Sequence, residues 1–216
     1  MGEGAGFMAW FNVGFLGLLL AVGAARLVEM RLSRRHQRRL QALGFGRERE
    51  PGFGLMVALH TGILVGAAVE VVVARRPLIG PLAVTALAAF LLANALRLWV
   101  IRTMADHWNV NVVDSLALGV VTSGPYRWVR HPNYVAVFVE LLALPLIHTA
   151  YVTALGGAVL HVVVLRRRLA LEDRVLLSNP AYRTAMAAKP RFVPRLGSVT
   201  PPVKTPASGP APGPRA

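Results

Sequence analysis

The residue pattern with the clearest chemical meaning is "RHPNY", Arg130 to Tyr134, which stands directly before a strongly apolar run. Pro132 is a natural first residue of a helix, because its ring already holds a helical φ and no N–H is lost there. The first turn of a helix presents free N–H groups and a partial positive charge, so Arg130 and His131 lie where cations are unfavourable. The pattern therefore predicts an anion-binding site. The alternative is that Arg130 only reaches lipid phosphate, as interfacial arginines do.

A second group of reactive side chains lies in "RRRLALEDR". Arg168 and Glu172 are four residues apart, so they share one face of a helix, and Asp173 lies one residue further round. Taken alone, this spacing is typical of a solvated surface ion pair. It becomes a candidate active site if the chain returns this helix to the membrane surface where His131 lies.

The composition indicates which elements position these residues. Of 216 residues, 55% are hydrophobic and 16% are charged, which favours an integral membrane protein over a soluble domain. The net charge of +14 is gathered between apolar blocks, which argues against a nucleic-acid-binding face. The chain has no cysteine, so disulfides, thiolate metal sites and cysteine nucleophiles are excluded, and no other metal-ligand spacing stands out.

Three apolar blocks, at about 7–30, 55–73 and 78–101, are long enough to cross a bilayer as helices. The stretch 134–165 is apolar again and has turn signals at Pro145, His148, Thr149 and Gly156-Gly157, which predicts two short helices in a tight hairpin. We therefore expect an all-α membrane fold of about five spans with a small cytoplasmic cap. The tail 196–216 is rich in Pro, Gly, Ala and Ser and is expected to be disordered.

Basic residues predict the orientation of this fold. They are dense after the first, third and fifth predicted spans, and sparse in the other two connections. The positive-inside rule then places the N-terminus outside and the C-terminus in the cytoplasm. The basic stretch after the first span is expected to prolong that helix near anionic headgroups and to end at Gly44.

Several ionisable residues lie inside the predicted spans, where they usually face other protein groups. Arg26 and Glu29 are expected to pair within one helix, and Glu140 with Arg97 between helices. His148 and His161 are interpreted as structural. The pattern assigns no role to His60 or Glu70.

"GPYRWVRHPNYVAVFVELLALPL", followed by the "ED" pair and "NPAY", resembles the isoprenylcysteine carboxyl methyltransferase family of integral membrane methyltransferases, which is related to the phospholipid methyltransferases. The family pattern is Arg-His-Pro-x-Tyr, a pair of spans, and two adjacent acids. Here Asp173 replaces the usual second Glu. The resemblance covers about 96–195. The front half is similar to a bacterial branch associated in part with O-methylation of phenolic lipids and alkylpyrones.

The resemblance implies three regions: membrane helices over 1–101, a catalytic region over 102–195, and the tail. It also implies S-adenosylmethionine bound in the cytoplasmic cap, a lipophilic acceptor entering sideways from the bilayer, and a bacterial inner-membrane location. Arg168 and Glu172 would form the reaction centre. The residues implied to hold the cofactor are Tyr126, Arg130, His131, Pro132, Tyr134, Glu172 and Asp173.

The acceptor stays open at this point. A prenylcysteine-type carboxylate is ionised at pH 7, so Arg168 would only orient it, whereas a phenol with a pKa near 10 would need Glu172 or His131 as a base. A phospholipid amine is a third acceptor. A non-enzymatic module that binds anionic lipid is the alternative from another class.

Overall fold

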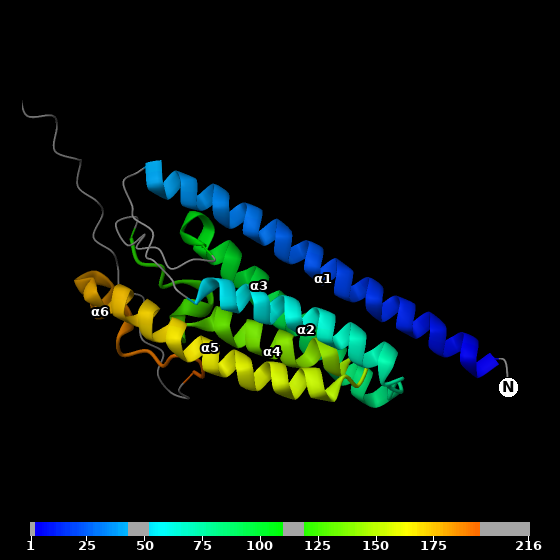
Figure 1. The fold of residues 1–216 in the computed structure, drawn as a ribbon. Coiled ribbons are helices and arrows are strands. Elements are labelled where there is room, and N and C mark those ends of the chain that lie inside the picture. The colour runs from blue at the N-terminus through cyan, green and yellow to red at the C-terminus, as the bar shows by residue number, and fades with distance from the viewer. Residues whose placement is uncertain (1–2, 43–51, 110–118, 195–216) are drawn as a thin grey trace, which may run out of the picture.

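The protein is a bundle of helices. The computed structural model describes residues 3–42, 52–109 and 119–194, and every regular element in these ranges is helical, which confirms the predicted all-α fold (Figure 1). The α-helices are α1 (Glu3–Ala42), α2 (Phe53–Val73), α3 (Gly80–Met104), α4 (Pro132–Leu146), α5 (Tyr151–Ser178) and α6 (Pro180–Met186). Two short 3-10 helices, η1 (Ala105–His107) and η3 (Gly124–Arg127), lie between α3 and α4.

Helices α1, α2 and α3 are each long and apolar enough to cross a membrane, as the sequence predicts. The protein is therefore an integral membrane protein. Helix α4 has 15 residues, which gives a length of about 22 Å at 1.5 Å per residue, against a hydrocarbon core of roughly 30 Å. Three spans are confirmed on this measure, and the expected total of five stays a prediction.

The core of the bundle is apolar and joins the first four α-helices. Its buried residues are Phe15, Leu19 and Val22 of α1, Ala67 and Val71 of α2, Phe90 of α3, and Ala143 and Leu144 of α4, with Ala150 beyond α4. Many large apolar side chains instead lie on the outside, such as Leu20, Val73 and Leu92, each at least 71% exposed. Such an outer surface is suited to hydrocarbon, in which exposed apolar groups carry no cost.

The predicted hairpin is confirmed, with its turn between Leu146 and Tyr151. Gly156 and Gly157 lie inside α5 and do not form the turn. The physical role of Gly157 is close packing, because a Cβ atom there would lie 2.8 Å from side-chain atoms of Ile63 on α2. Its missing side chain lets α2 and α5 approach each other closely.

Glu70 near the end of α2 binds the first turn of α5, which gives this residue a structural role that its sequence context did not reveal. One carboxylate oxygen accepts hydrogen bonds from the N–H and the hydroxyl of Thr153, both at 2.8 Å, and the other accepts from the N–H of Val152 at 3.1 Å. Arg76 donates to the same carboxylate at 2.7 Å. The acid therefore satisfies N–H groups that a helix start leaves unpaired.

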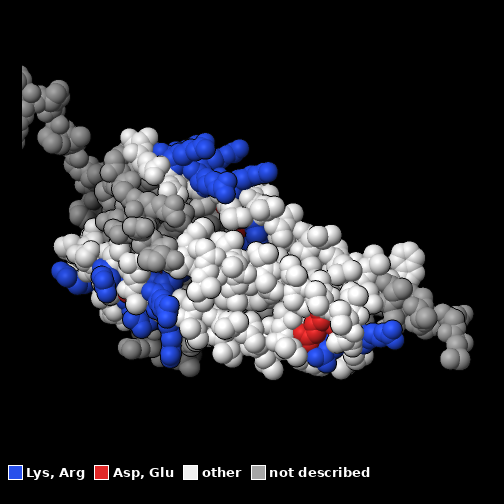
Figure 2. Space-filling model, in the orientation of Figure 1, with Lys and Arg blue, Asp and Glu red and all other residues white. Residues whose placement is uncertain are grey.

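The basic ends of α1, α3 and α5 lie at one end of the bundle, opposite the turns α2–α3 and α4–α5 (Figure 1). Lys and Arg side chains gather at this end, and the middle of the visible face is largely free of charge (Figure 2). Helix α1 continues to Ala42 as predicted. Its extension has a buried face, because the Ser33 hydroxyl contacts Asn109 and the His36 ring contacts the Trp108 carbonyl. Gly44 and the tail 196–216 lie outside the described residues.

Candidate functional site

The start of α4 and the end of α5 form one cluster, because the hairpin returns α5 beside the residue from which α4 begins. His131 directly precedes α4 and is 4% exposed. Its Nε2 lies 2.9 Å from Asp173 Oδ1, and its Nδ1 lies 3.5 Å from Glu172 Oε1. The two motifs that the sequence analysis selected, 42 residues apart at these positions, therefore meet in space.

Asp173 holds the basic side of this cluster together. Its Oδ2 accepts a hydrogen bond from Arg191 Nε at 2.9 Å, while Oδ1 lies 3.5 Å from Arg130 Nη1 as well as facing His131. The carboxylate is buried and is absent from the residues that line the adjoining cavity. Asp173 therefore orients the basic groups from behind.

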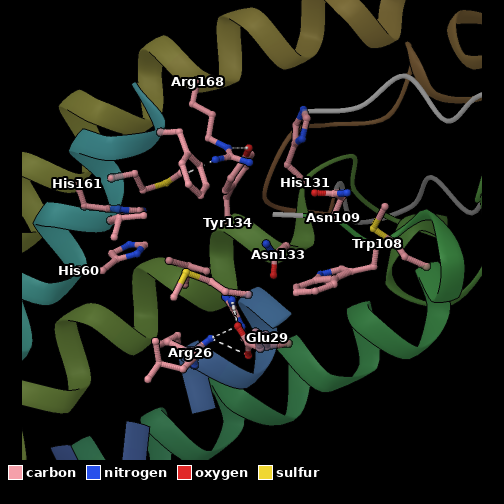
Figure 3. Close-up of a pocket in the computed structure, with 18 of the residues that line it drawn as sticks. Arg26, Glu29, His60, Trp108, Asn109, His131, Asn133, Tyr134, His161 and Arg168 are labelled. Atoms are coloured by element: carbon pink, nitrogen blue, oxygen red, sulfur yellow. Dashed lines mark hydrogen bonds and ion pairs between the residues drawn. The ribbon is translucent and has the colours of Figure 1, made fainter. Parts of the chain in front are cut away.

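Tyr134, in the first turn of α4, links the two proposed reaction-centre residues. Its hydroxyl donates a short hydrogen bond to Glu172 and accepts one from Arg168 Nε at 2.7 Å. The Arg168 guanidinium also lies 5.8 Å from the centre of the tyrosine ring and 3.8 Å from the sulfur of Met56 on α2. The contacts with Tyr134 and Met56 direct Arg168 toward the space between α2, α4 and α5 (Figure 3).

The chain after α6 closes the site from the other side. The N–H of Arg130 donates to the carbonyl of Pro190, and that of His131 donates to the carbonyl of Arg191, both at 2.9 Å. Lys189 Nζ donates to the carbonyl of Tyr126 at 2.8 Å. These bonds attach the segment after α6 to the chain before α4.

Burial and charge act in opposite directions on His131. Burial alone lowers the pKa of the imidazole, but the hydrogen bonds and charges of Asp173 and Glu172 outweigh it and hold the pKa above its ordinary value. Burial likewise tends to raise the pKa of the Glu172 and Asp173 carboxyls, and His131 with the nearby arginines holds both below their usual range. The cluster therefore stabilises the imidazolium form of His131 beside two carboxylates.

A cavity of about 930 Å³ adjoins this cluster. Arg130, His131, Tyr134, Arg168 and Glu172 line one part of it. Figure 3 shows His131, Tyr134 and Arg168 together in the upper half of the view. Apolar residues of α1 and α2 line much of the rest, among them Leu16, Leu19, Leu20, Leu27, Val57, Leu64 and Val65. The cavity thus joins a charged rim to an apolar interior.

Four ionic residues of the membrane helices form a network, and three of them, Arg26, Glu29 and Arg97, line another wall of the cavity. Arg26 pairs with Glu29 at 2.7 Å, as predicted, and also with Glu140 at 2.5 Å. Arg97 pairs with Glu29 at 2.5 Å. The expected Glu140–Arg97 pair is therefore wrong, because the face of α1 that carries Arg26 is turned toward α4 and places this guanidinium against Glu140.

The remaining expected site residues have distinct surroundings. Tyr126 lines the cavity, and its hydroxyl donates to the sulfur of Met104 at 2.8 Å. Pro132 is buried as the first residue of α4 and does not line the cavity. The sequence analysis missed Arg191 and Asn133. Arg191 has no distinctive spacing, whereas Asn133 lies inside the "RHPNY" motif and was open to selection there.

Residues 84–178 match the model of the isoprenylcysteine carboxyl methyltransferase (ICMT) family. This part of the chain is similar to the ICMT family. The ICMT segment runs from α3 to the end of α5 and includes both motifs of the cluster. The similarity is to a family of membrane methyltransferases, and the helices of this chain suit a membrane.

Two bacterial proteins are similar over most of the chain. The protein YpbQ of Bacillus subtilis (strain 168) is 27% identical over 152 residues, which cover 70% of this chain and 89% of that protein. A protein of Haemophilus influenzae (strain ATCC 51907 / DSM 11121 / KW20 / Rd) is 25% identical over 170 residues, covering 78% and 96%. Both are described as uncharacterized, so the likeness adds no substrate.

Proposed function

We propose that the protein is an S-adenosylmethionine-dependent O-methyltransferase whose acceptor is an acidic, lipophilic molecule. The observation that carries this proposal is the junction of the charged cluster at His131, Arg168 and Glu172 with an apolar cavity of about 930 Å³. A charged rim suits a zwitterionic cofactor, and an apolar interior suits a lipid chain.

The rim offers unpaired groups of both polarities to a cofactor. Arg130 Nε and Asn133 Oδ1 are buried without a hydrogen-bond partner among the described residues, and both side chains line the cavity. Arg130 with His131 would hold a carboxylate, while Asn133 and Glu172 would hold an ammonium or sulfonium group. S-adenosylmethionine has all three groups and, when bound, supplies an electrophilic methyl group. Tyr126, Tyr134 and Asp173 would support this binding site.

The cavity wall supports entry of the acceptor from the bilayer. Leu20, Leu27 and Val65 line the cavity and are also 76%, 55% and 57% exposed on the outside of the bundle. An apolar chain between α1 and α2 would therefore stay in contact with hydrocarbon. The charged head group would lie at the rim, where Arg168 can orient it and closed packing would limit competing water.

The electrostatics of the rim support an acceptor that is already anionic. The pKa of Glu172 is lowered, which makes its carboxylate a weaker base, and that of His131 is raised, which favours the protonated ring. Arg168 and the His131 imidazolium would instead stabilise a carboxylate or an acidic enolate. An unactivated phenol fits less well, and a protonated phospholipid amine would meet like charge. The positive-inside pattern supports a cytoplasmic rim, with the N-terminus outside, in a bacterial inner membrane.

Binding and transfer should be tested separately on protein in lipid nanodiscs. We expect the wild type to bind S-adenosylmethionine in a calorimeter and to add one methyl group to a component of a bacterial lipid extract, detected by mass spectrometry. Arg168→Gln and Glu172→Gln should lower the transfer rate at least tenfold, since each removes a charged contact worth about 1.5–3 kcal/mol. Arg167→Gln is the matched control, because Arg167 is exposed on the same helix.

Folded wild-type protein that does not bind S-adenosylmethionine would refute the proposal. If the wild type and Glu172→Gln instead bound anionic vesicles equally well, the non-enzymatic lipid-binding module would be favoured.

A further inference from the structure

A pair of histidines lies deeper in the cavity than the charged rim. His60 of α2 and His161 of α5 stack with ring centres 5.5 Å apart and an angle of 29° between the rings. Both line the cavity, and Figure 3 shows them side by side on the wall away from His131. The close approach of α2 and α5 at Gly157 and Ile63, one turn away on each helix, brings the two rings together.

The polar atoms of this pair lack partners. His60 Nε2 and both ring nitrogens of His161 are buried without a hydrogen bond to any described residue. His161 is only 1% exposed. Leaving a buried polar group unpaired is unfavourable, and such groups normally bind protein, water or a ligand. The cavity is the space from which a partner can reach them.

The chemistry of two imidazoles limits what that partner can be. A neutral imidazole has one N–H donor and one nitrogen acceptor, so the pair can bind a hydroxyl or a carbonyl oxygen. The described residues contain no cluster of three or more metal-ligating side chains. The stacked rings are also poorly arranged to converge on one ion. An uncharged oxygen on an otherwise apolar molecule fits this position.

The helices set the distance from this pair to the rim. His161 and Arg168 are seven residues apart on α5, which corresponds to about 10 Å along the helix. On the facing helix, His60 lies one turn from Met56, whose sulfur contacts Arg168. Both helices therefore place the histidines one to two turns beyond the guanidinium.

We propose that His60 and His161 form a second polar subsite for the acceptor, which binds a hydroxyl or carbonyl oxygen about 10 Å from the oxygen that receives the methyl group. This inference rests on the proposed function for the identity of the ligand as acceptor. It narrows the acceptor class to lipids with a second oxygen on the chain or on a second ring.

Two synthetic probes test this subsite by binding alone. Both are long-chain carboxylic acids, and they differ by one chain hydroxyl placed about 10 Å from the carboxylate. Their affinities are measured by calorimetry in phosphatidylcholine nanodiscs. The affinity of the hydroxylated probe is divided by that of the other probe. This ratio should be about fivefold higher in the wild type than in His161→Phe or His60→Phe, which is the effect of roughly one hydrogen bond.

His148→Phe is the matched control. His148 is also 1% exposed with both ring nitrogens unpaired among the described residues, but it lines a separate pocket at the turn between α4 and α5. The wild-type ratio should persist in this variant, and His161→Gln should restore part of it. An unchanged ratio in both His161→Phe and His60→Phe, or no binding of either probe, would overturn the proposal.

A spectroscopic experiment on the wild-type protein tests the subsite even if the variants do not fold. In wild-type protein with ¹⁵N-labelled histidine, the hydroxylated probe should shift the ring nitrogen signals of His60 and His161, while the matched probe should not. Equal shifts with both probes would overturn the subsite. Methyl transfer is assayed independently, so a binding preference without any transfer would retain the subsite and refute the proposed enzyme.

Discussion

Glu29 is the residue on which the ionic network inside the bundle depends. It accepts hydrogen bonds from Arg26 at 2.8 and 2.7 Å and from Arg97 at 3.0 and 2.5 Å. Its side chain is 18% exposed, and those of Arg97 and Glu140 are 10% and 5% exposed. Glu29→Gln keeps the shape but removes the charge that two guanidinium groups share.

The expected cost follows from what each arginine retains. Arg97 loses its carboxylate partner, and breaking a buried ion pair by removing one member costs about 3–5 kcal/mol. The amide oxygen of glutamine still accepts one hydrogen bond, so we expect a loss of about 3 kcal/mol for Glu29→Gln. Glu140→Gln should cost only about 1–2 kcal/mol, because Arg26 keeps Glu29 as its partner.

The free energy of unfolding should be measured by titrating mild-detergent micelles with sodium dodecyl sulfate. Glu29→Gln combined with Arg97→Gln should be less destabilised than the sum of the single variants by about 2 kcal/mol, since Arg26 and Glu140 remain a balanced pair. Arg102→Gln is the control on α3, because that arginine is exposed, and it should change stability by less than about 0.5 kcal/mol. Additive single effects, or equal losses from Glu29→Gln and Glu140→Gln, would refute the reasoning.

Two further predictions concern the rim. Asp173→Asn should lower the pKa of His131. Binding of S-adenosylmethionine, and any stability that the imidazolium contributes, should then decline at a lower pH than in the wild type. Calorimetry between pH 6 and 9 measures the pH at which binding is half lost, and an unchanged value would contradict the prediction. The wild-type contribution is complete below the ordinary histidine pKa of 6.5 and is lost as the pH rises through the raised value. Gly124→Ala should lower the melting temperature, because Gly124 has φ of +54° and an added Cβ would lie 2.5 Å from Thr103 Oγ1; unchanged melting would show that η3 can shift at little cost.

The meeting of the two motifs could be predicted because it depends only on connectivity. A tight turn after Leu146 brings the chain back along α4, so a helix that continues past Arg168 must pass the start of α4. Pro132 predicted where α4 begins, and the helix does begin at this residue. The length of the apolar stretch and the turn signals at Pro145, His148 and Thr149 were sufficient for this part of the site.

The ionic partners and the histidine pair depend on quantities that the sequence does not contain. Whether Glu140 meets Arg26 or Arg97 is decided by the rotation of each helix about its own axis, and apolar helices have little periodicity to set it. His161 was interpreted as structural, but its place on the cavity wall depends on how closely α2 approaches α5. Gly157 permits that approach, and its effect is visible only once Ile63 is known to lie opposite.

Helix α5 acts as a molecular ruler. It is continuous from the turn bound by Glu70 to Ser178, so it passes His161, Arg168 and Glu172 without a break. Adding one residue between His161 and Arg168 would turn everything beyond it by about 100° and move it by about 1.5 Å. For the proposed acceptor, the distance between its two bound oxygens would therefore be set by the spacing of His161 and Arg168 on one helix, and a change in this spacing would keep both side chains on the cavity wall only in steps of about one turn.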